Sequence, residues 1–264
     1  FLQNELRLFD RLFLTGGVRY DDNSVFGDTT TARAALSYVV RETDTRVKGS
    51  WGQGFRAPTF NELFFPAFPP CPSFGNPHLR PEESESWDAG AEQQLWQRRV
   101  RLGATIQTTL VDPTNFCFQA QNVGRARSQG TEVEASVAPV DGLLLAVAYT
   151  YTDTQDLVAH TPLRRFPKNR LAVTATWEPL ARLTLSGELQ LVSSQFEAAG
   201  QPRNPGYTVV NVGAQYRLPW RWGPLSAITL HLRVTNLFDE SYQETAGFPA
   251  LGTQVLAGIR AAFD

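Results

Sequence analysis

The feature that most constrains this chain is an alternation of apolar and polar residues that recurs along its whole length. From Leu183 to Leu191, for example, leucines alternate with polar residues such as Thr184 and Glu188. Successive side chains of a strand point to opposite faces, so each such segment predicts a strand with one apolar and one polar face. We count about thirteen strands, at residues 1–9, 12–21, 31–40, 46–55, 86–96, 99–110, 126–138, 143–152, 169–178, 183–195, 207–218, 226–237 and 254–263. Most have about ten residues, enough to cross a bilayer when tilted.

The connections between these strands alternate strictly between short and long. The short ones are Asp10-Arg11, Arg41–Thr45, Gln97-Arg98, Pro139–Gly142, Leu180–Arg182 and Pro219–Leu225. The long ones are Asp22–Thr30, Arg56–Glu85, Val111–Arg125, Asp153–Lys168, Phe196–Gly206 and Phe238–Thr253. Short periplasmic turns and longer outer loops are typical of membrane barrels. The sequence therefore predicts an all-β fold, a transmembrane antiparallel up-and-down β-barrel.

The composition limits the function without naming it. Hydrophobic residues make up 42% of the 264 residues and charged residues 19%, which is not the composition of a disordered chain. The net charge of −2 gives no reason to expect a nucleic-acid partner. No apolar run reaches about 18 residues, so no transmembrane helix is predicted. Because the chain has no Met and starts at Phe1 within the alternating pattern, we expect it to be a piece of a longer protein.

The longest interruption of the alternation is rich in Pro and Phe and runs from Arg56 to Glu85. A loop of this length inside a domain is usually functional. It is bounded by Phe55-Arg56-Ala57-Pro58 on one side and by Asn76-Pro77-His78-Leu79-Arg80-Pro81-Glu82 on the other. This pair resembles two motifs of TonB-dependent outer-membrane receptors, where the first ends a strand and the second leads into the next strand.

Further stretches resemble the same family in the same order along the chain. They are Leu14–Asp21, Asn122–Ala126 with Gly130–Glu134, Leu163–Pro167, and Val234–Tyr242. Each motif alone is weak, but their joint order and spacing are highly specific. The resemblance covers essentially all of residues 1–264 and corresponds to the C-terminal part of the family's barrel domain.

The resemblance implies a barrel of about twenty-two strands in the bacterial outer membrane, of which this chain supplies the last thirteen or so. It also implies a plug domain and a segment that grips TonB, both N-terminal to this chain. The implied function is TonB-energised uptake of a scarce metal chelate, either a siderophore or cobalamin. The implied partners are that chelate, outer-membrane lipid, the plug and TonB, with no cofactor and no nucleic acid. An open sheet of thirteen strands leaves two unpaired edges, so we do not expect this piece to be stable alone in a membrane.

Two sets of side chains are candidates for binding. Aromatic residues exposed in a long loop suit a planar or chelate-like ligand, although local loop packing explains any single Phe better. The ligand candidates are Phe60, Phe64, Phe65, Phe68, Phe74 and His78. Charged residues of the inward face are expected to line a polar lumen and to contact the plug. They are Arg19, Arg101, Glu132, Glu134, Arg170, Glu188, Arg233 and Arg260.

The two cysteines, Cys71 and Cys117, both fall in predicted outer loops. Because the outer surface is an oxidising place, our hypothesis is a disulfide that ties these loops together, and the alternative is two free thiols. Haem receptors of the resembled family carry a His between the two loop motifs. Here no His lies between Pro58 and Asn76, so haem is disfavoured as the ligand.

No catalytic constellation and no metal-type spacing can be found around the three His residues, so we expect neither an enzyme nor a metal site. A first alternative is a passive porin-like channel or a smaller closed barrel, in which the inward Arg and Glu residues would set ion selectivity. A plug-encoding segment upstream would argue against that channel. A soluble β-rich binding protein is disfavoured, because the face opposite Thr, Gln and Arg is nearly all apolar.

Overall fold

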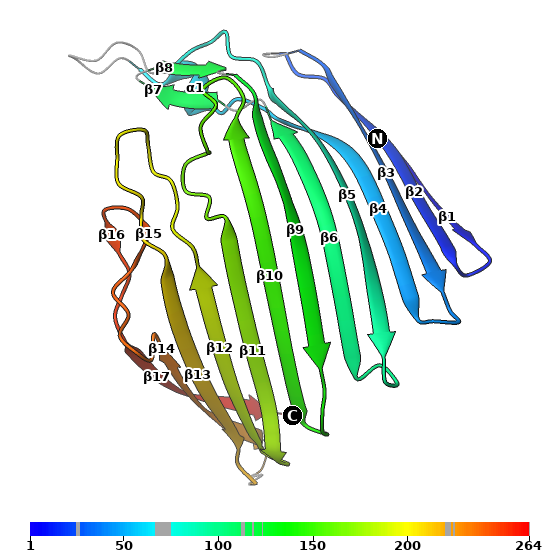
Figure 1. Cartoon of the computed structure of the whole chain (residues 1–264), viewed down its shortest axis with the longest axis vertical. Coiled ribbons are helices and arrows are strands. Elements are labelled where there is room, and N and C mark those ends of the chain that lie inside the picture. The colour runs from blue at the N-terminus through cyan, green and yellow to red at the C-terminus, as the bar shows by residue number, and fades with distance from the viewer. Residues whose placement is uncertain are drawn as a thin grey trace. The chain divides into compact units, whose positions relative to one another are not determined.

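One thirteen-stranded sheet contains all the long strands of the chain, and its strand order follows the chain order (Figure 1). The computed structural model describes residues 1–24, 27–66, 75–111, 114–117, 119–122, 124–219, 223 and 225–263, and between 110 and 122 the backbone alone. Every strand pair whose register is defined is antiparallel. The all-β antiparallel prediction is confirmed.

The strands of the sheet are β1 (Leu2–Leu8), β2 (Leu12–Asp21), β3 (Thr29–Val40), β4 (Thr45–Arg56), β5 (Glu82–Leu95), β6 (Val100–Val111), β9 (Ala126–Val137), β10 (Leu143–Asp156), β11 (Asn169–Leu180), β12 (Leu183–Val192), β13 (Tyr207–Arg217), β14 (Leu225–Thr235) and β17 (Gln254–Phe263). Five short elements lie in the long connections: α1 (Phe60–Phe64), β7 (Thr114–Cys117), β8 (Gln119–Asn122), β15 (Gln243–Thr245) and β16 (Phe248–Pro249). β7 pairs with β8 and β15 with β16 as separate two-stranded sheets.

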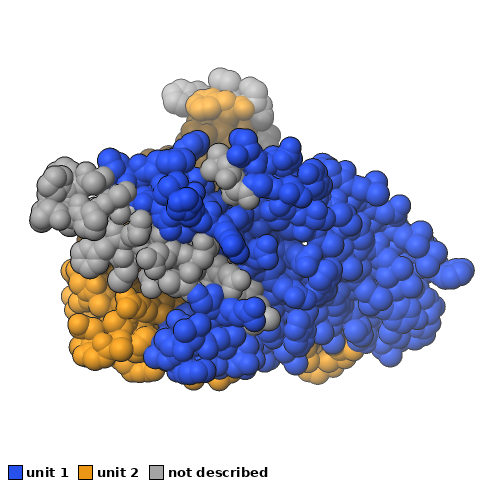
Figure 2. Space-filling view, turned by 90° about the horizontal axis from the view of Figure 1, so that it is seen from above, with its two compact units in different colours: residues 1–92, 105–131, 153–163 blue, residues 93–104, 132–152, 164–264 orange. Residues whose placement is uncertain are grey.

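The chain divides into two compact units, which Figure 2 shows in two colours. Unit 1 comprises residues 1–92, 105–131 and 153–163, and unit 2 comprises residues 93–104, 132–152 and 164–264. The long loop after β4 belongs to unit 1, and the last long loop, before β17, belongs to unit 2. No helix in the described ranges is both long enough and apolar enough to cross a membrane.

Strand register sorts the side chains onto one apolar and one polar face. On β10 and β11, Val147 stands opposite Val173, whereas Ala146 stands opposite Thr174. Val173 is 38% exposed, and many other large apolar residues of the same face are exposed as well. In the described part of the chain, the buried apolar residues are only Leu63, Leu79, Ala126 and Val209. Exposed apolar surface on this scale is typical of a face that contacts a membrane or another protein surface.

The connections between neighbouring strands of the sheet alternate between short and long, as predicted. The short ones are residues 9–11, 41–44, 96–99, 138–142, 181–182 and 218–224. The long ones are residues 22–28, 57–81, 112–125, 157–168, 193–206 and 236–253. All the candidate ligand residues thus fall in a long connection.

The structure differs from the sequence prediction mainly around the first long loop. β5 starts at Glu82 rather than at residue 86. Side-chain hydrogen bonds from Ser84 to the Gly54 carbonyl and from Trp51 to Glu85 join β4 and β5 there. The sequence analysis treated this stretch only as an interruption of the alternation and did not identify the helix α1 that it contains.

The division into two faces predicts that the same substitution harms assembly at one position of β11 and is tolerated at the next. Val173→Arg places a charge on the apolar face, where the cost at a bilayer midplane is about 2–4 kcal/mol. Thr174→Arg places the same charge on the polar face, opposite Glu188. We expect the first variant of the complete gene product to assemble poorly in outer membranes and the second to assemble normally, measured as the protease-resistant, folded fraction. Equal losses in both variants would contradict the assignment of the faces.

Candidate functional site

The first long loop, residues 57–81, opens with a capped turn of helix. Thr59 is the N-cap of α1, and its hydroxyl accepts a hydrogen bond of 3.3 Å from the backbone N–H of Glu62. The Glu62 carboxylate in turn accepts a bond of 2.7 Å from the Thr59 backbone N–H. This reciprocal capping box explains why Thr-Phe-Asn-Glu begins a helix immediately after the Arg56-Ala57-Pro58 break.

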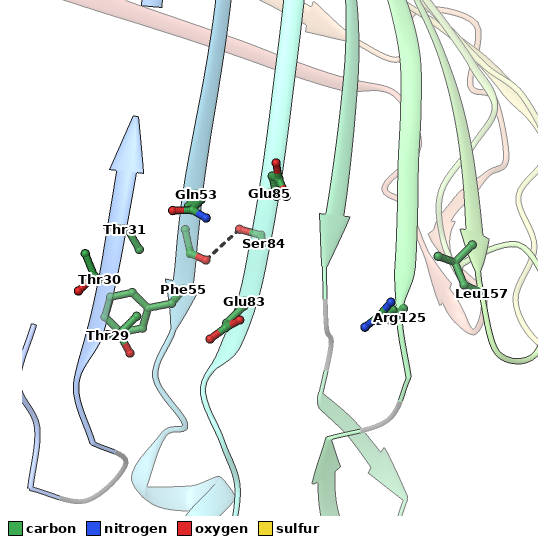
Figure 3. A pocket seen from close by; sticks show the side chains of 11 residues that line it. Thr29, Thr30, Thr31, Gln53, Phe55, Glu83, Ser84, Glu85, Arg125 and Leu157 are labelled. Carbon is green, nitrogen blue, oxygen red and sulfur yellow. Dashed lines mark hydrogen bonds between the residues drawn. The ribbon is translucent and has the colours of Figure 1, made fainter. Parts of the chain in front are cut away.

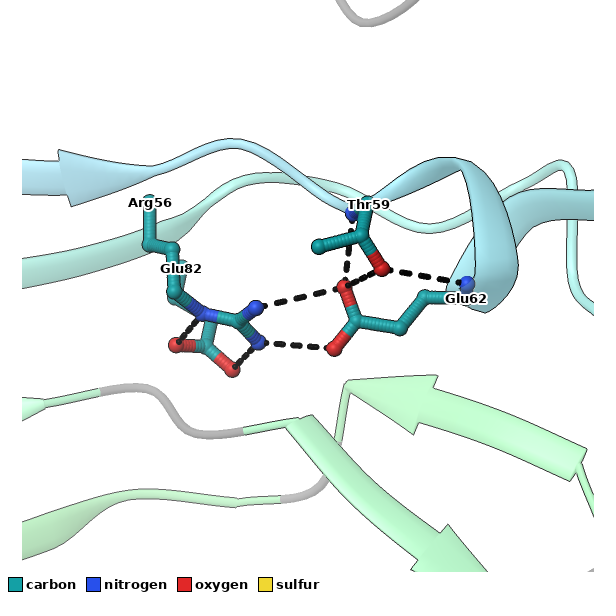
Figure 4. A network of polar contacts seen from close by, with 4 residues as sticks. All are labelled: Arg56, Thr59, Glu62 and Glu82. Atoms are coloured by element: carbon teal, nitrogen blue, oxygen red, sulfur yellow. Dashed lines mark hydrogen bonds and ion pairs between the residues drawn. The ribbon is translucent and has the colours of Figure 1, made fainter.

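An ion-pair hub joins the two ends of this loop (Figure 4). Arg56, at the end of β4, donates two hydrogen bonds of 2.8 and 2.7 Å to Glu82, at the start of β5. Its guanidinium also donates two bonds of 3.2 and 3.0 Å to Glu62 in α1. The side chains of Glu62 and Glu82 are only 7% and 13% exposed. Paired bonds of this kind are strong and fix geometry, so the hub fixes α1 to the strand ends.

Apolar packing closes the base of the loop beneath the hub. Leu63 of α1 and Leu79 before β5 form a small cluster and are 4% and 5% exposed. Gly75 donates a backbone bond of 3.1 Å to Phe65. A Cβ on Gly75 would lie 2.6 Å from the Phe65 nitrogen, so only glycine allows this close approach.

The predicted ligand residues of α1 and its C-cap are exposed and are not part of this packed base. Phe60 is 82% exposed, Phe64 56% and Phe65 44%. The rings of Phe60 and Phe64 lie 6.4 Å apart, which joins them into one aromatic surface. His78 is also exposed, on the other arm of the loop. The structure therefore offers these four side chains to solvent, as a ligand contact requires.

The remaining loop candidates fall where the structure makes no statement. Phe68, Phe74 and Cys71 lie outside the described residues, and Cys117 ends β7, where only the backbone is described. Ligand contact by the two phenylalanines and the disulfide between the cysteines stay predictions.

A groove of about 390 Å³ lies in unit 1 at the ends of the strands that carry this loop (Figure 3). It is lined by Thr29, Thr30 and Thr31 of β3, by Gln53, Gly54 and Phe55 of β4, by Glu83, Ser84 and Glu85 of β5, and by Arg125 and Leu157. Phe55 directly precedes the Arg56 of the hub and Glu83 directly follows Glu82, so the groove adjoins the foot of the loop. Most of the residues that line it are polar by type. Within the described ranges, no cluster of three His, Cys, Asp or Glu residues could hold a metal ion.

All eight charged residues predicted for the lumen lie on strands. They are Arg19 on β2, Arg101 on β6, Glu132 and Glu134 on β9, Arg170 on β11, Glu188 on β12, Arg233 on β14 and Arg260 on β17. In unit 2, Glu188 accepts a hydrogen bond of 3.2 Å from Asn211, and Arg233 lies 3.9 Å from the same carboxylate. These contacts place the three side chains on one polar face. That this face lines a lumen and meets a plug stays a prediction.

Sequence reasoning missed a set of buried amides that anchor the last long loop, residues 236–253. Asn236 is 4% exposed, and its side chain donates to the carbonyls of Glu240 and Leu251 at 2.9 and 3.3 Å. It also accepts a bond of 2.8 Å from the Glu240 backbone N–H. Gln195 and Asn204 are 7% and 5% exposed. Asn236 lies in the Val234–Tyr242 motif, and this was the only sequence feature that could have pointed to it. No sequence feature pointed to Gln195 or Asn204.

The hub also determines how the loop responds to acid. Burial raises the pKa of the Glu62 carboxyl, but hydrogen bonds from Arg56 and Thr59 outweigh burial and hold that pKa below its ordinary value of 4.5. A carboxyl whose pKa falls on folding stabilises the folded state above its unfolded pKa. That stabilisation is lost as the pH drops from about 4.5 through the lowered pKa.

Hydrogen exchange tests this link between Glu62 and the loop. The reporters are the backbone N–H groups of Leu63 and Asn76, which donate to the carbonyls of Thr59 and Glu62. We expect their protection, corrected for intrinsic rates, to be high at pH 7 and to fall as the pH drops below about 4.5. Glu62→Gln should lower their protection about tenfold at pH 7, since bonds to charged groups contribute roughly 1.5–3 kcal/mol.

The control for that experiment is Glu83→Gln, which removes an exposed carboxyl from the neighbouring strand. It should leave the protection of both amides unchanged at every pH. Equal effects of the two substitutions, or a wild-type loop whose protection does not depend on pH, would show that the hub does not hold the loop.

Comparison with known proteins identifies the family to which a chain with this sheet and these loops belongs. The family described as "TonB dependent receptor-like, beta-barrel" matches residues 1–237. The chain is 30% identical over 257 residues to "Vitamin B12 transporter BtuB" of Photobacterium profundum, covering 92% of this chain and 39% of that protein. It is 27% identical over 233 residues to the protein of the same name from Vibrio vulnificus, covering 86% of this chain and 35% of that protein.

Solved structures show the same fold at lower identity. The ferric enterobactin receptor PfeA of Pseudomonas aeruginosa, as the G324V mutant, superposes with a TM-score of 0.80 at 17% identity, covering 97% of this chain and 43% of that one. The copper transporter OprC superposes with a TM-score of 0.77 at 18% identity, covering 97% and 48%. The chain thus spans less than half the length of each of these relatives. It belongs to the TonB-dependent receptor family and corresponds to part of that family's β-barrel.

Proposed function

We propose that this chain forms the larger part of the barrel wall of an outer-membrane receptor that imports a metal chelate, and that the chelate is of the cobalamin class. The observation that carries the proposal is the 30% identity to a vitamin B12 transporter over 92% of the chain. Uptake would be energised by TonB through segments outside this chain, in the way that the family implies.

The loop after β4 supports a role in capture. Its base is fixed by the Arg56 hub, whereas Phe60 and Phe64 project from it into solvent. A rigid base that presents exposed aromatic side chains lowers the entropy lost when a ligand binds. Large aromatic surfaces of this kind suit a bulky, partly apolar chelate.

The charge of the loop supports a chelate of low net charge. Residues 57–81 contain one Arg, one His and one Glu, but five Phe. Arg56, at the loop's root, is committed to two carboxylates. A strongly anionic ferric catecholate would be bound best by several unpaired cations. A cobalamin-type ligand, which is recognised through its large apolar ring and its amides, matches this loop better.

The polar face supports a wall that encloses a hydrated interior. The cluster of Glu188, Asn211 and Arg233 is held together by hydrogen bonding and charge. The side chain of Arg233 is 62% exposed, which leaves it able to contact a further group. We propose that the plug, supplied by another part of the protein, makes that contact.

The function is tested in bacteria that lack their own cobalamin receptor and carry the complete gene. We expect growth on nanomolar cyanocobalamin that requires an intact TonB system. A Phe60→Ala/Phe64→Ala double variant should bind cyanocobalamin about tenfold more weakly, because it removes two large apolar contacts. Binding is measured with radiolabelled cyanocobalamin on outer-membrane vesicles.

The matched control is Phe9→Ala, which removes a ring that is 90% exposed but lies in a short connection. Its affinity should equal that of the wild type. Cyanocobalamin uptake that persists without TonB, or ion conductance with no ligand binding, would favour the passive channel. Saturable binding of a ferric catecholate in place of cyanocobalamin would support the receptor function but would contradict the proposal that the ligand is of the cobalamin class.

A further inference from the structure

A groove of about 590 Å³ crosses the first four strands of the sheet, all of which belong to unit 1 (Figure 1). Two rows of residues that stand opposite one another on these strands contribute to its lining. One row consists of Leu6, Leu14, Leu36 and Gly49, and the next consists of Asn4, Gly16, Ala34 and Trp51. Residues directly opposite each other share a face, and the first row is mostly leucine. The groove therefore opens on the apolar face of the sheet.

Small side chains leave space in this groove. Gly16 and Ala34 stand opposite each other on β2 and β3. A Cβ on Gly16 would have no other atom within 4 Å, so the space above this glycine is open. Leu6 and Leu36, which also line the groove, are 48% and 44% exposed. Small residues beside larger ones allow two protein surfaces to approach closely inside a membrane.

The groove also contains a polar side chain that hydrocarbon cannot satisfy. Asn4 lies midway along β1, alternates with Leu2 and Leu6 on the apolar face, and is exposed. Its amide carries two N–H donors and one carbonyl acceptor. Lipid chains offer neither donors nor acceptors, whereas amide side chains bond to each other across protein contacts in membranes. An exposed amide at this position therefore favours a protein partner over lipid.

We propose that this groove is the contact surface for a second copy of the protein, related to the first by a twofold axis along the membrane normal. A twofold axis brings the same surface of each copy together, so Asn4 faces Asn4 of the partner subunit. Two primary amides complement each other, because each donates one N–H to the carbonyl of the other. The leucines of one copy pack into the space above Gly16 in the other. This inference goes beyond the proposed function and does not depend on which chelate is carried.

Sedimentation equilibrium of the complete gene product in detergent micelles tests the contact. Asn4→Leu should weaken dimerisation about tenfold, because it removes the reciprocal amide bonds. Gly16→Leu fills the groove and should weaken dimerisation at least as much. The matched control is Gly187→Leu, which places the same side chain in open space on the apolar face of unit 2, opposite Ala175. It should dimerise like the wild type, and all the variants should keep the wild-type protease-resistant, folded fraction.

Photocross-linking in outer membranes identifies what occupies the groove. Two differently tagged copies are expressed together, each with photoreactive benzoylphenylalanine in place of Leu6. We expect cross-links that join the two tags, and none when the photoreactive residue replaces Val173 on β11.

The inference would be overturned by a wild type that stays monomeric, or by Asn4→Leu and Gly16→Leu variants that dimerise like the wild type. Cross-links from position 6 that stay within one chain, or that reach only lipid or a different protein, would overturn it as well. None of these results would affect the proposed function, because no ligand enters the experiment. Failure of the wild type to bind cyanocobalamin would instead overturn the proposed function and leave the dimer contact standing.

Discussion

The constraint on which the rest of this structure depends is that every backbone polar group inside a bilayer needs a partner in the protein. Strands satisfy this constraint by hydrogen bonding to neighbouring strands. In this sheet every strand from β2 to β14 in the strand order has a neighbour on both sides. β1 and β17 stand at the ends of the strand order, so each has a single strand partner among the described residues. The relatives, of which the chain spans less than half, are long enough to supply the missing neighbours. Register matters equally, because a shift of one residue would move every polar side chain to the apolar face.

The exposure of polar and apolar side chains is the reverse of that in a soluble domain, which buries its large apolar residues and exposes its polar ones. Large apolar side chains of the sheet are exposed, whereas four of the five buried polar residues in the described part of the chain lie in long loops, Thr154 on β10 being the fifth. Glu62 stabilises the first long loop and Asn236 stabilises the last one, each through several hydrogen bonds. Such polar support matters in these loops, because the buried apolar cluster of the first loop consists of Leu63 and Leu79 alone among the described residues. The polar contacts that fix the first loop leave Phe60 and Phe64 exposed to solvent.

The sequence predicted what depends on local pattern. All thirteen strands were found, since alternation over about ten residues is a local signal, and the exposed Phe60 and Phe64 followed from the loop's composition. The helix α1 was missed although its Thr59 to Glu62 capping box is visible in the sequence. Contacts such as Gln195 to Glu244, which lie 49 residues apart, had no local signal at all. They depend on how two loops fold together, which a single sequence does not encode in any short pattern.

The central claim is that one face of the sheet contacts lipid and the other contacts water. Spin labels placed singly at residues 171 to 177 of the complete gene product, in outer membranes, test it most directly by their accessibility to oxygen and to a water-soluble nickel reagent. The account predicts that Leu171, Val173, Ala175 and Trp177 positions are accessible to oxygen, and that the three positions between them are accessible to nickel. Uniform accessibility along the strand, or the reverse alternation, would contradict it.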